Sequence, residues 1–176
     1  MEDFQHVGYS KEVIEFVTVA KEFCDLVERS DREEKKPFLL QLQKLLPLIY
    51  LKGCLLPGCE SNELEMTEEV VTENDYDFLR ERVWQLMAED DDYLEVFDDN
   101  MQFNEMPVVA SIAEKVCDIY QDLKNFISLY QHGMPDVIQE ALWLLNTNFE
   151  FYWGKTCTSL LRAVHAAIYR VTDEEI

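Results

Sequence analysis

The chain has 176 residues, of which 48% are hydrophobic, so it can bury a core and is not wholly disordered. Its 36 acidic and 15 basic residues give a formal net charge of -21, which repels phosphate backbones and anionic membrane surfaces. The sequence has only 5 glycines and 5 prolines, which is too few for the many turns of an all-β sandwich, so that fold is excluded. We therefore expect one mostly helical domain, residues 1–176, that binds neither nucleic acid nor membrane directly.

No segment of the sequence predicts secretion or membrane insertion. The first six residues lack the basic start and apolar stretch of a signal peptide. The longest uninterrupted apolar run, residues 45–51, is about a third of the length that a membrane span needs. We expect a cytoplasmic protein with reduced cysteines. Cys54 and Cys59 flank a Pro-Gly turn, but a disulfide between them is disfavoured in the reducing cytoplasm.

The first predicted helix begins after Ser10, a good N-cap, and runs to about Arg29 with apolar residues at helical spacing. A second helix starts at Pro37 and is interrupted by Pro47, which is expected to kink it or end its first half. Because this second segment is apolar on nearly every side, we expect it at the centre of the bundle, with Leu45 and Leu51 among its buried residues.

An acidic loop, about residues 58–72, separates the second helix from a third. Thr72 and Asp75 have the spacing of a near capping box at the start of that third helix. An acidic segment, residues 89–105, contains a short amphipathic stretch and leads to a fourth helix that Pro107 should open and Gly133 should end. The fourth helix is marked by an apolar seam with steps of three and four: Val109, Ile112, Val116, Ile119, Leu123, Phe126 and Tyr130.

The last predicted helical region opens at Pro135 and covers residues 136–171, and Gly154 marks a bend or a close helix contact within it. The predicted fold class is thus all-α: a single-domain bundle of five to six helices with one long acidic loop.

The negative charge is concentrated in one part of the chain. Residues 60–105 contain 17 acidic and two basic residues, a net charge of -15. A solvated surface is the ordinary explanation of such a segment. A basic protein partner or a divalent cation are the functional alternatives.

The sequence contains no strong catalytic or cofactor motif. Phosphate-binding glycine loops, zinc-protease and nucleophile-elbow motifs and calcium loops are all missing, so we predict no cofactor and no metal site. Four carboxylates on the first helix, Glu12, Glu15, Glu22 and Asp25, form two pairs three residues apart. Because both pairs fall on one helix, a solvent-exposed helix face is favoured over a cation bound between the carboxylates.

The weak candidates for a ligand site lie on the last two predicted helices. On the last, Glu150, Trp153, Arg162 and His165 surround Gly154 and could line a pocket for an anion or small ligand. Glu114 and Asp118 of the fourth helix are the nearby acids that would complete it. Against this, a helix–helix contact explains such a His and Arg more simply. Four aromatics crowd residues 149–153, and they cannot all face one core, which favours a docking groove or a homodimer.

Several stretches resemble one bacterial family. They are EFVTVAKEFC (residues 15–24), LLPLIYLK (45–52), IYQDLKNF (119–126), NFEFYWG (148–154) and LRAVH (161–165). The sequence resembles the domain-of-unknown-function 5063 family, found especially in Bacteroides and relatives. The resemblance implies a helical cytoplasmic protein with no assigned activity, and so it transfers no catalytic residues. The positions that look family-like are Glu114, Asp118, Tyr120, Asp122, Trp153, Gly154, Arg162 and His165.

Two hypotheses about function follow. The leading one is a non-enzymatic helical interaction or regulatory protein whose acidic region meets a basic protein partner. The alternative is an enzyme or binder of a small ligand or metal, with a site on the last helix. The absence of catalytic motifs weighs against an enzyme.

Overall fold

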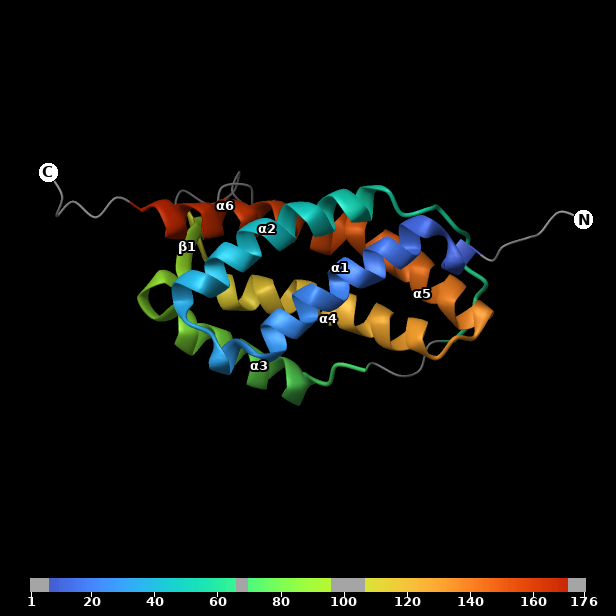
Figure 1. The fold of residues 1–176 in the computed structure, drawn as a ribbon, viewed down its shortest axis with the longest axis horizontal. Coiled ribbons are helices and arrows are strands. Elements are labelled where there is room, and N and C mark those ends of the chain that lie inside the picture. Colours follow the sequence, from blue (N-terminus) through green and yellow to red (C-terminus); the bar gives the residue numbers. More distant parts are fainter. Residues whose placement is uncertain (1–6, 66–69, 96–106, 171–176) are drawn as a thin grey trace, which may run out of the picture.

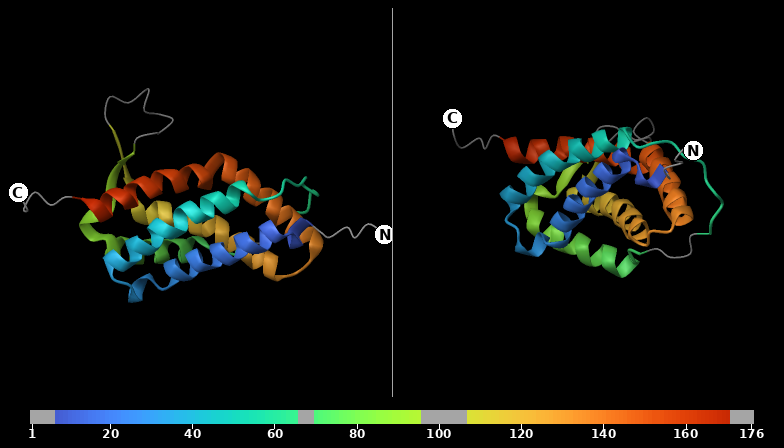
Figure 2. Two further views of the ribbon diagram at one scale, coloured as in Figure 1. Left: turned by 45° about the horizontal axis from the view of Figure 1, so that its top comes forward. Right: turned by 45° about the vertical axis from the view of Figure 1, so that its right-hand side comes forward.

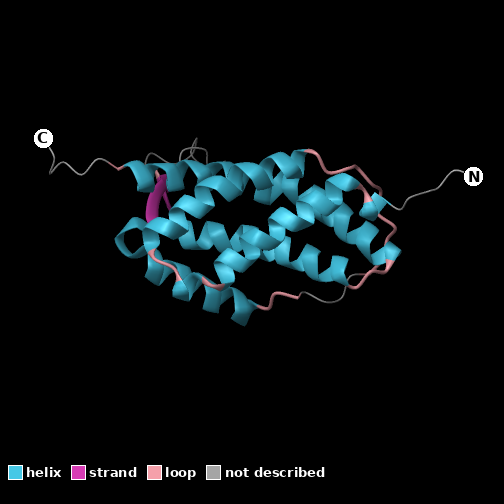
Figure 3. Cartoon of the chain, in the orientation of Figure 1, coloured by secondary structure: helices cyan, strands magenta, loops and turns pink. Residues whose placement is uncertain are grey.

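The computed structural model describes residues 7–65, 70–95 and 107–170, and within them the chain forms a bundle of six α-helices (Figures 1 and 3). The helices are α1 (Lys11–Glu28), α2 (Lys35–Cys54), α3 (Glu73–Met87), α4 (Ile112–Gln131), α5 (Pro135–Asn148) and α6 (Gly154–Tyr169). Strands β1 (Asp92–Glu95) and β2 (Val108–Ser111) pair antiparallel, and a π-helical turn, η5 (Phe149–Trp153), joins α5 to α6. The predicted all-α bundle is confirmed.

Side-chain caps define where three helices begin. The Val13 amide donates to Ser10 Oγ at 3.4 Å, which confirms Ser10 as the N-cap of α1. The predicted capping box is present at α3, where the Asp75 amide donates to Thr72 Oγ1 and the Thr72 amide donates to the Asp75 carboxylate. Ser111 caps α4 in the same way.

Helix α4 occupies the middle of the bundle and packs against α1, α3, α5 and α6 (Figure 1). Its buried stripe runs through Ile112, Val116, Ile119, Leu123 and Phe126. The expectation that the second helix is central is therefore wrong. Helix α2 lies between α1 and α6 on the outside of the bundle (Figure 2). It is apolar on nearly every side because it has two apolar faces, of which the bundle buries one.

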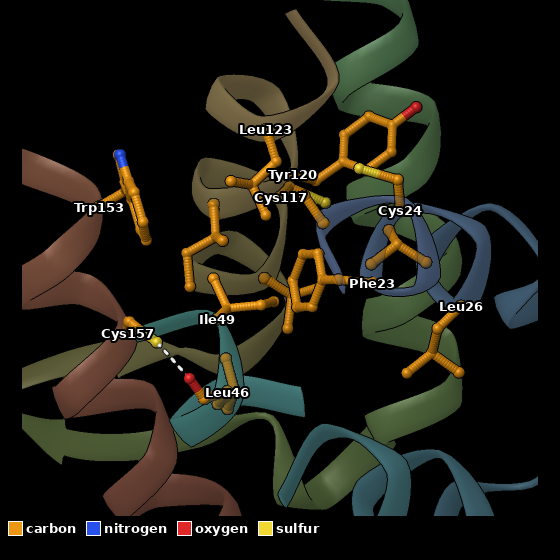
Figure 4. Close-up of a cluster of buried hydrophobic side chains, with 14 of the residues drawn as sticks. Phe23, Cys24, Leu26, Leu46, Ile49, Cys117, Tyr120, Leu123, Trp153 and Cys157 are labelled. Atoms are coloured by element: carbon orange, nitrogen blue, oxygen red, sulfur yellow. Dashed lines mark hydrogen bonds between the residues drawn. The ribbon is translucent and has the colours of Figure 1, made fainter. Parts of the chain in front are cut away.

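The core forms where α1, α2, α4 and α6 meet (Figure 4). Phe23 and Leu26 of α1, Ile49 of α2 and Leu123 of α4 are fully buried there. The Cys157 thiol of α6 donates to the Leu46 carbonyl oxygen of α2 at 3.2 Å, so this buried sulfur fastens the two helices together.

Pro47 was expected to kink the second helix or to end its first half, and it does not end it. Helix α2 continues through it from Lys35 to Cys54. The proline ring is exposed, and its missing N–H deprives only the Gln43 carbonyl of a helical partner. Packing of the buried face against α1 and α6 holds the helix together.

A β-hairpin replaces the predicted start of the fourth helix. Pro107 does not open a helix. Val108 and Val109 lie in β2, paired with Glu95 and Leu94 of β1, and α4 begins only at Ile112. Adjacent β-branched residues favour a strand, and buried Asp91 fixes the join by accepting from the Ala113 amide at 2.8 Å. Of the amphipathic stretch expected here, Val96 and Phe97 lie outside the described residues.

The described part of the acidic loop is held against α5 rather than projecting from the bundle. Buried Glu140 accepts hydrogen bonds from the Ser61 hydroxyl (2.9 Å) and the Asn62 amide (2.9 Å). The Gln139 side chain donates to the Glu60 carbonyl, and Asn146 donates to the Pro57 carbonyl. A buried carboxylate satisfied by loop donors therefore fixes the path of residues 57–62.

Candidate functional site

A cleft with a volume of about 340 Å³ lies where α3 meets the hairpin and the first turn of α4. We name it the acidic cleft. Its lining residues are Arg80, Glu81, Trp84, Asp91, Asp92, Ser111 and Glu114. Four carboxylates and one guanidinium give the acidic cleft a net negative charge.

Trp84 forms the apolar wall of the acidic cleft. The buried stripe of α3 consists of Leu79, Val83 and Met87, four residues apart, so Trp84 is turned about 100° away from the core. Half of its side chain (50%) is exposed. A large indole left open to solvent beside carboxylates is unusual for a surface helix, and it offers an aromatic face to a ligand.

The carboxylates of the acidic cleft differ in how they are used. Asp91 is committed to the structure through its bond to the Ala113 amide. Glu81 accepts from Gln85, and Arg80 is paired with Asp77 at 3.1 Å. Asp92 and Glu114, by contrast, make no ion pair with the residues that the structure describes. The acidic cleft therefore presents free negative charge beside an aromatic ring.

A second cleft, of about 460 Å³, lies between α4 and the π-helical turn, and we name it the π-turn cleft. It is lined by Lys115, Asp118, Gln121, Asp122, Phe151, Tyr152, Trp153, Lys155 and Thr156. The turn exposes Phe151 (55%) and Tyr152 (67%), while Trp153 is buried and its indole N–H donates to the Leu145 carbonyl at 3.1 Å.

The polar residues that α4 contributes to the π-turn cleft lie on a half-buried face of that helix, because α3 and the π-helical turn flank it. Asp118 accepts a 2.7 Å bond from the Tyr76 hydroxyl, and Asp122 accepts from Asn148 at 2.8 Å. Burial raises the pKa of Asp122, and the bond from Asn148 only partly opposes that rise.

Gly154 makes the π-helical turn possible. A Cβ at this position would lie 2.3 Å from the Phe149 carbonyl oxygen, and a Cβ at Gly53 of α2 would lie 2.7 Å from the Trp153 ring. The prediction of a bend or close contact at Gly154 is thus confirmed. Single π-helical turns of this kind occur often at functional sites.

The six residues singled out from the sequence do not converge. Asp118 and Trp153 share the π-turn cleft, whereas Glu114 lines the acidic cleft. Arg162 lines a third cleft, of about 380 Å³, between β1 and α6. His165 is exposed on α6, where its ring packs at a tilt against Tyr169 with the ring centroids 4.7 Å apart, and Glu150 is exposed on the π-helical turn.

Sequence reasoning missed Trp84, Asp92 and Lys155. A tryptophan on the polar side of an otherwise regular amphipathic helix was the available signal for Trp84. For Asp92 there was none, because its place in the acidic cleft depends on the hairpin.

The carboxylate pairs of α1 are occupied by lysines. Lys52 donates to Glu15 at 2.6 Å and Lys21 to Asp25 at 2.5 Å. Among the described residues, no three His, Cys, Asp or Glu side chains are placed to hold a metal ion. None of the described helices has the length and hydropathy needed to cross a bilayer.

Comparison with known proteins gives a family and a fold. The model of the domain of unknown function DUF5063 matches residues 7–170. The crystal structure of protein BF1032 from Bacteroides fragilis is similar, with a TM-score of 0.85 and 36% sequence identity over 96% of this chain and 99% of that one. No curated protein matches. Because the family model spans both clefts and all six α-helices of the described residues, this chain belongs to the DUF5063 family.

Proposed function

We propose that this protein is a helical interaction protein that binds a basic segment of a protein partner in the acidic cleft. The observation that carries the proposal is the half-exposed Trp84 ring, set in a cleft whose other walls are mainly carboxylates. An arginine or lysine side chain can contact the carboxylates and the indole ring of this cleft at the same time. Its cation meets Asp92 and Glu114, and its flat or extended part lies on the indole.

The same helix already shows this chemistry within the chain. The Arg82 guanidinium lies over the Phe78 ring, 5.3 Å from its centroid. Phe78 is one turn and a half before Trp84 and is even more exposed. Helix α3 thus carries two exposed aromatic side chains, one in contact with a cation from the chain and one open in the acidic cleft.

Long-range electrostatics favours the same class of partner. Five of the seven residues that line the acidic cleft belong to the segment 60–105, whose net charge is -15, so a basic surface would be attracted over several ångströms before contact. The cleft is at the small end of ligand pockets, and it therefore suits one anchoring side chain of a peptide rather than a folded surface.

The test is fluorescence anisotropy with a labelled peptide of alternating arginine and alanine. We expect Glu114→Gln and Trp84→Leu each to weaken binding about twofold to thirtyfold, because cation–π and charge pairs of this kind contribute about 0.5–2 kcal/mol. Glu22→Gln is the matched control, since it removes the same charge from an exposed position on α1. Equal losses in Glu114→Gln and Glu22→Gln would reduce the effect to net charge and contradict the proposal.

A small-ligand binder is the second candidate, and the π-turn cleft is the observation that favours it. Exposed Tyr152 offers a stacking face, and Lys155 has no acidic partner in the described part of the chain. These two groups suit a planar ring that carries an anionic group. Thermal melting with nucleoside monophosphates should then show stabilisation that Lys155→Ala abolishes. Unchanged melting with all of them would count against this candidate.

A further inference from the structure

Helix α2 has an apolar stripe that the bundle leaves open. Leu48 (39%), Leu51 (53%) and Leu55 (51%) are exposed at spacings of three and four residues, and Pro47 is exposed beside them. The opposite stripe of α2, which includes Leu42, Leu46 and Ile49, is fully buried. A helix that is apolar on two faces is typical of an element covered on both sides.

The charge around this stripe is unlike that of the remaining surface. Helices α2 and α6, which pack against each other, contain six lysines and arginines and no acidic residue. They carry +6, whereas the rest of the chain carries -27. Lys35 and Lys52 are paired with acids of neighbouring elements, so among the described residues Lys36 and Lys44 are the α2 lysines without an ion pair.

We propose that this α2 face binds a second copy of the chain to form a two-fold symmetric dimer. Two molecules of net charge -21 repel each other wherever carboxylates meet. The α2 face reduces that repulsion, because neither α2 nor α6 contains a carboxylate, and Glu15 of α1 at its edge is paired with Lys52. An apolar stripe is also self-complementary, as a two-fold interface requires.

The dimensions of the α2 face agree with a dimer. A helix of 20 residues is about 30 Å long, and together with the near sides of α1 and α6 it offers a strip about 20 Å wide, or roughly 600 Å². Standard interfaces bury about 600–1,000 Å² from each partner. At the α6 side the exposed Tyr169 ring, whose hydroxyl accepts from Gln43 at 3.3 Å, extends the strip. At its middle Lys44 can lay its aliphatic stem along the apolar surface and keep its ammonium in water.

Added salt should not weaken the dimer, whereas it should weaken the binding of a basic peptide to the acidic cleft. Screening weakens the repulsion between two negative molecules and leaves apolar burial intact, so the dimer is equally or more stable at high salt. Binding of a basic peptide weakens under the same conditions. The dimer does not require the acidic cleft, and Trp84→Leu should leave it unchanged.

The test is sedimentation velocity of the full chain from about 1 to 100 µM at two salt concentrations. We expect the mass to rise with concentration from 20.8 kDa to twice that value. Leu51→Glu should weaken the dimer at least tenfold. Val109→Glu, which places the same acid at an exposed apolar residue of the hairpin, should have little effect.

A second variant guards against a change in folding. Lys44→Glu adds a carboxylate to the α2 face without removing an apolar side chain, and it too should weaken the dimer while circular dichroism confirms an unchanged helix content. A mass of 20.8 kDa at every concentration would overturn the proposal. So would a dimer that both α2 variants leave intact.

Discussion

The Tyr76 hydroxyl donates a 2.7 Å hydrogen bond to Asp118 Oδ1 and thereby joins α3 to α4. Burial, and then this bond, raise the pKa of Tyr76 well above its ordinary value of 10. The Tyr76→Phe variant keeps the ring and loses the bond, so we expect it to lower the free energy of unfolding by about 1.5 kcal/mol at pH 7.

The same bond predicts an alkaline limit to stability. A tyrosine whose pKa is raised by folding stabilises the native state fully below pH 10, and that contribution is lost as the pH rises above 10. Urea unfolding at pH 7 and pH 10.5 should show a smaller loss for Tyr76→Phe than for the wild type. Some loss should persist, because burial also raises the pKa values of Tyr93 and Tyr120. Identical losses in the two proteins would contradict this account.

The Asp122→Asn variant should be more stable than the wild type at pH 7. Burial raises the pKa of Asp122, so its ionised form is disfavoured by folding, and stability falls as the pH rises through the range between the unfolded and folded pKa values. Asparagine retains an oxygen that can accept from Asn148. Melting temperatures from pH 4 to pH 8 should be higher and less dependent on pH for this variant. Glu22→Gln, which removes an exposed charge, should give a smaller gain.

The Gly154→Ala variant should destabilise the bundle by about 2 kcal/mol, because the new methyl group collides with the Phe149 carbonyl and forces the π-helical turn to move. Gly58→Ala is the matched control, since nothing lies within 4 Å of a Cβ built there. Denaturant unfolding measures both. If the two substitutions had the same effect, the turn would not depend on the missing side chain.

The five thiols should react at three different rates. Cys54 is exposed, whereas Cys24, Cys117 and Cys157 are buried, and burial raises the pKa values of Cys117 and Cys157 to about 12. A disulfide reagent should therefore modify Cys54 rapidly and these three only after unfolding. Half-buried Cys59 should react at an intermediate rate, because burial raises its pKa as well. Rapid modification of any of the three buried thiols in native buffer would contradict the packing around them.

Local signals in the sequence predicted the helices well. The caps at Ser10 and Thr72, the proline at the start of α5 and the glycine at the π-helical turn each act within a few residues of their own position. Such features can be read from the sequence because the physical cause and its effect lie in the same segment.

Non-local packing accounts for what the sequence could not provide. Val109 matches the seam of α4 in spacing, yet its pairing with Leu94 draws it into a strand. Helix α2 has the composition of a central helix, but the bundle leaves its second apolar face exposed. Arg162 and Glu114 are separated because their helices present them to different clefts. Each outcome depends on residues far away along the chain.

The most direct test of the acidic cleft is a titration of the arginine–alanine peptide followed by the indole N–H signals of the 15N-labelled protein. The chain has three tryptophans, and only the Trp84 side chain faces the acidic cleft, while Trp153 is buried with its N–H already bonded. We predict that the Trp84 signal shifts as the peptide binds, that the Trp153 signal stays in place, and that the affinity falls steeply with added salt. A peptide that binds without moving the Trp84 signal, or whose affinity does not depend on salt, would contradict the proposed function.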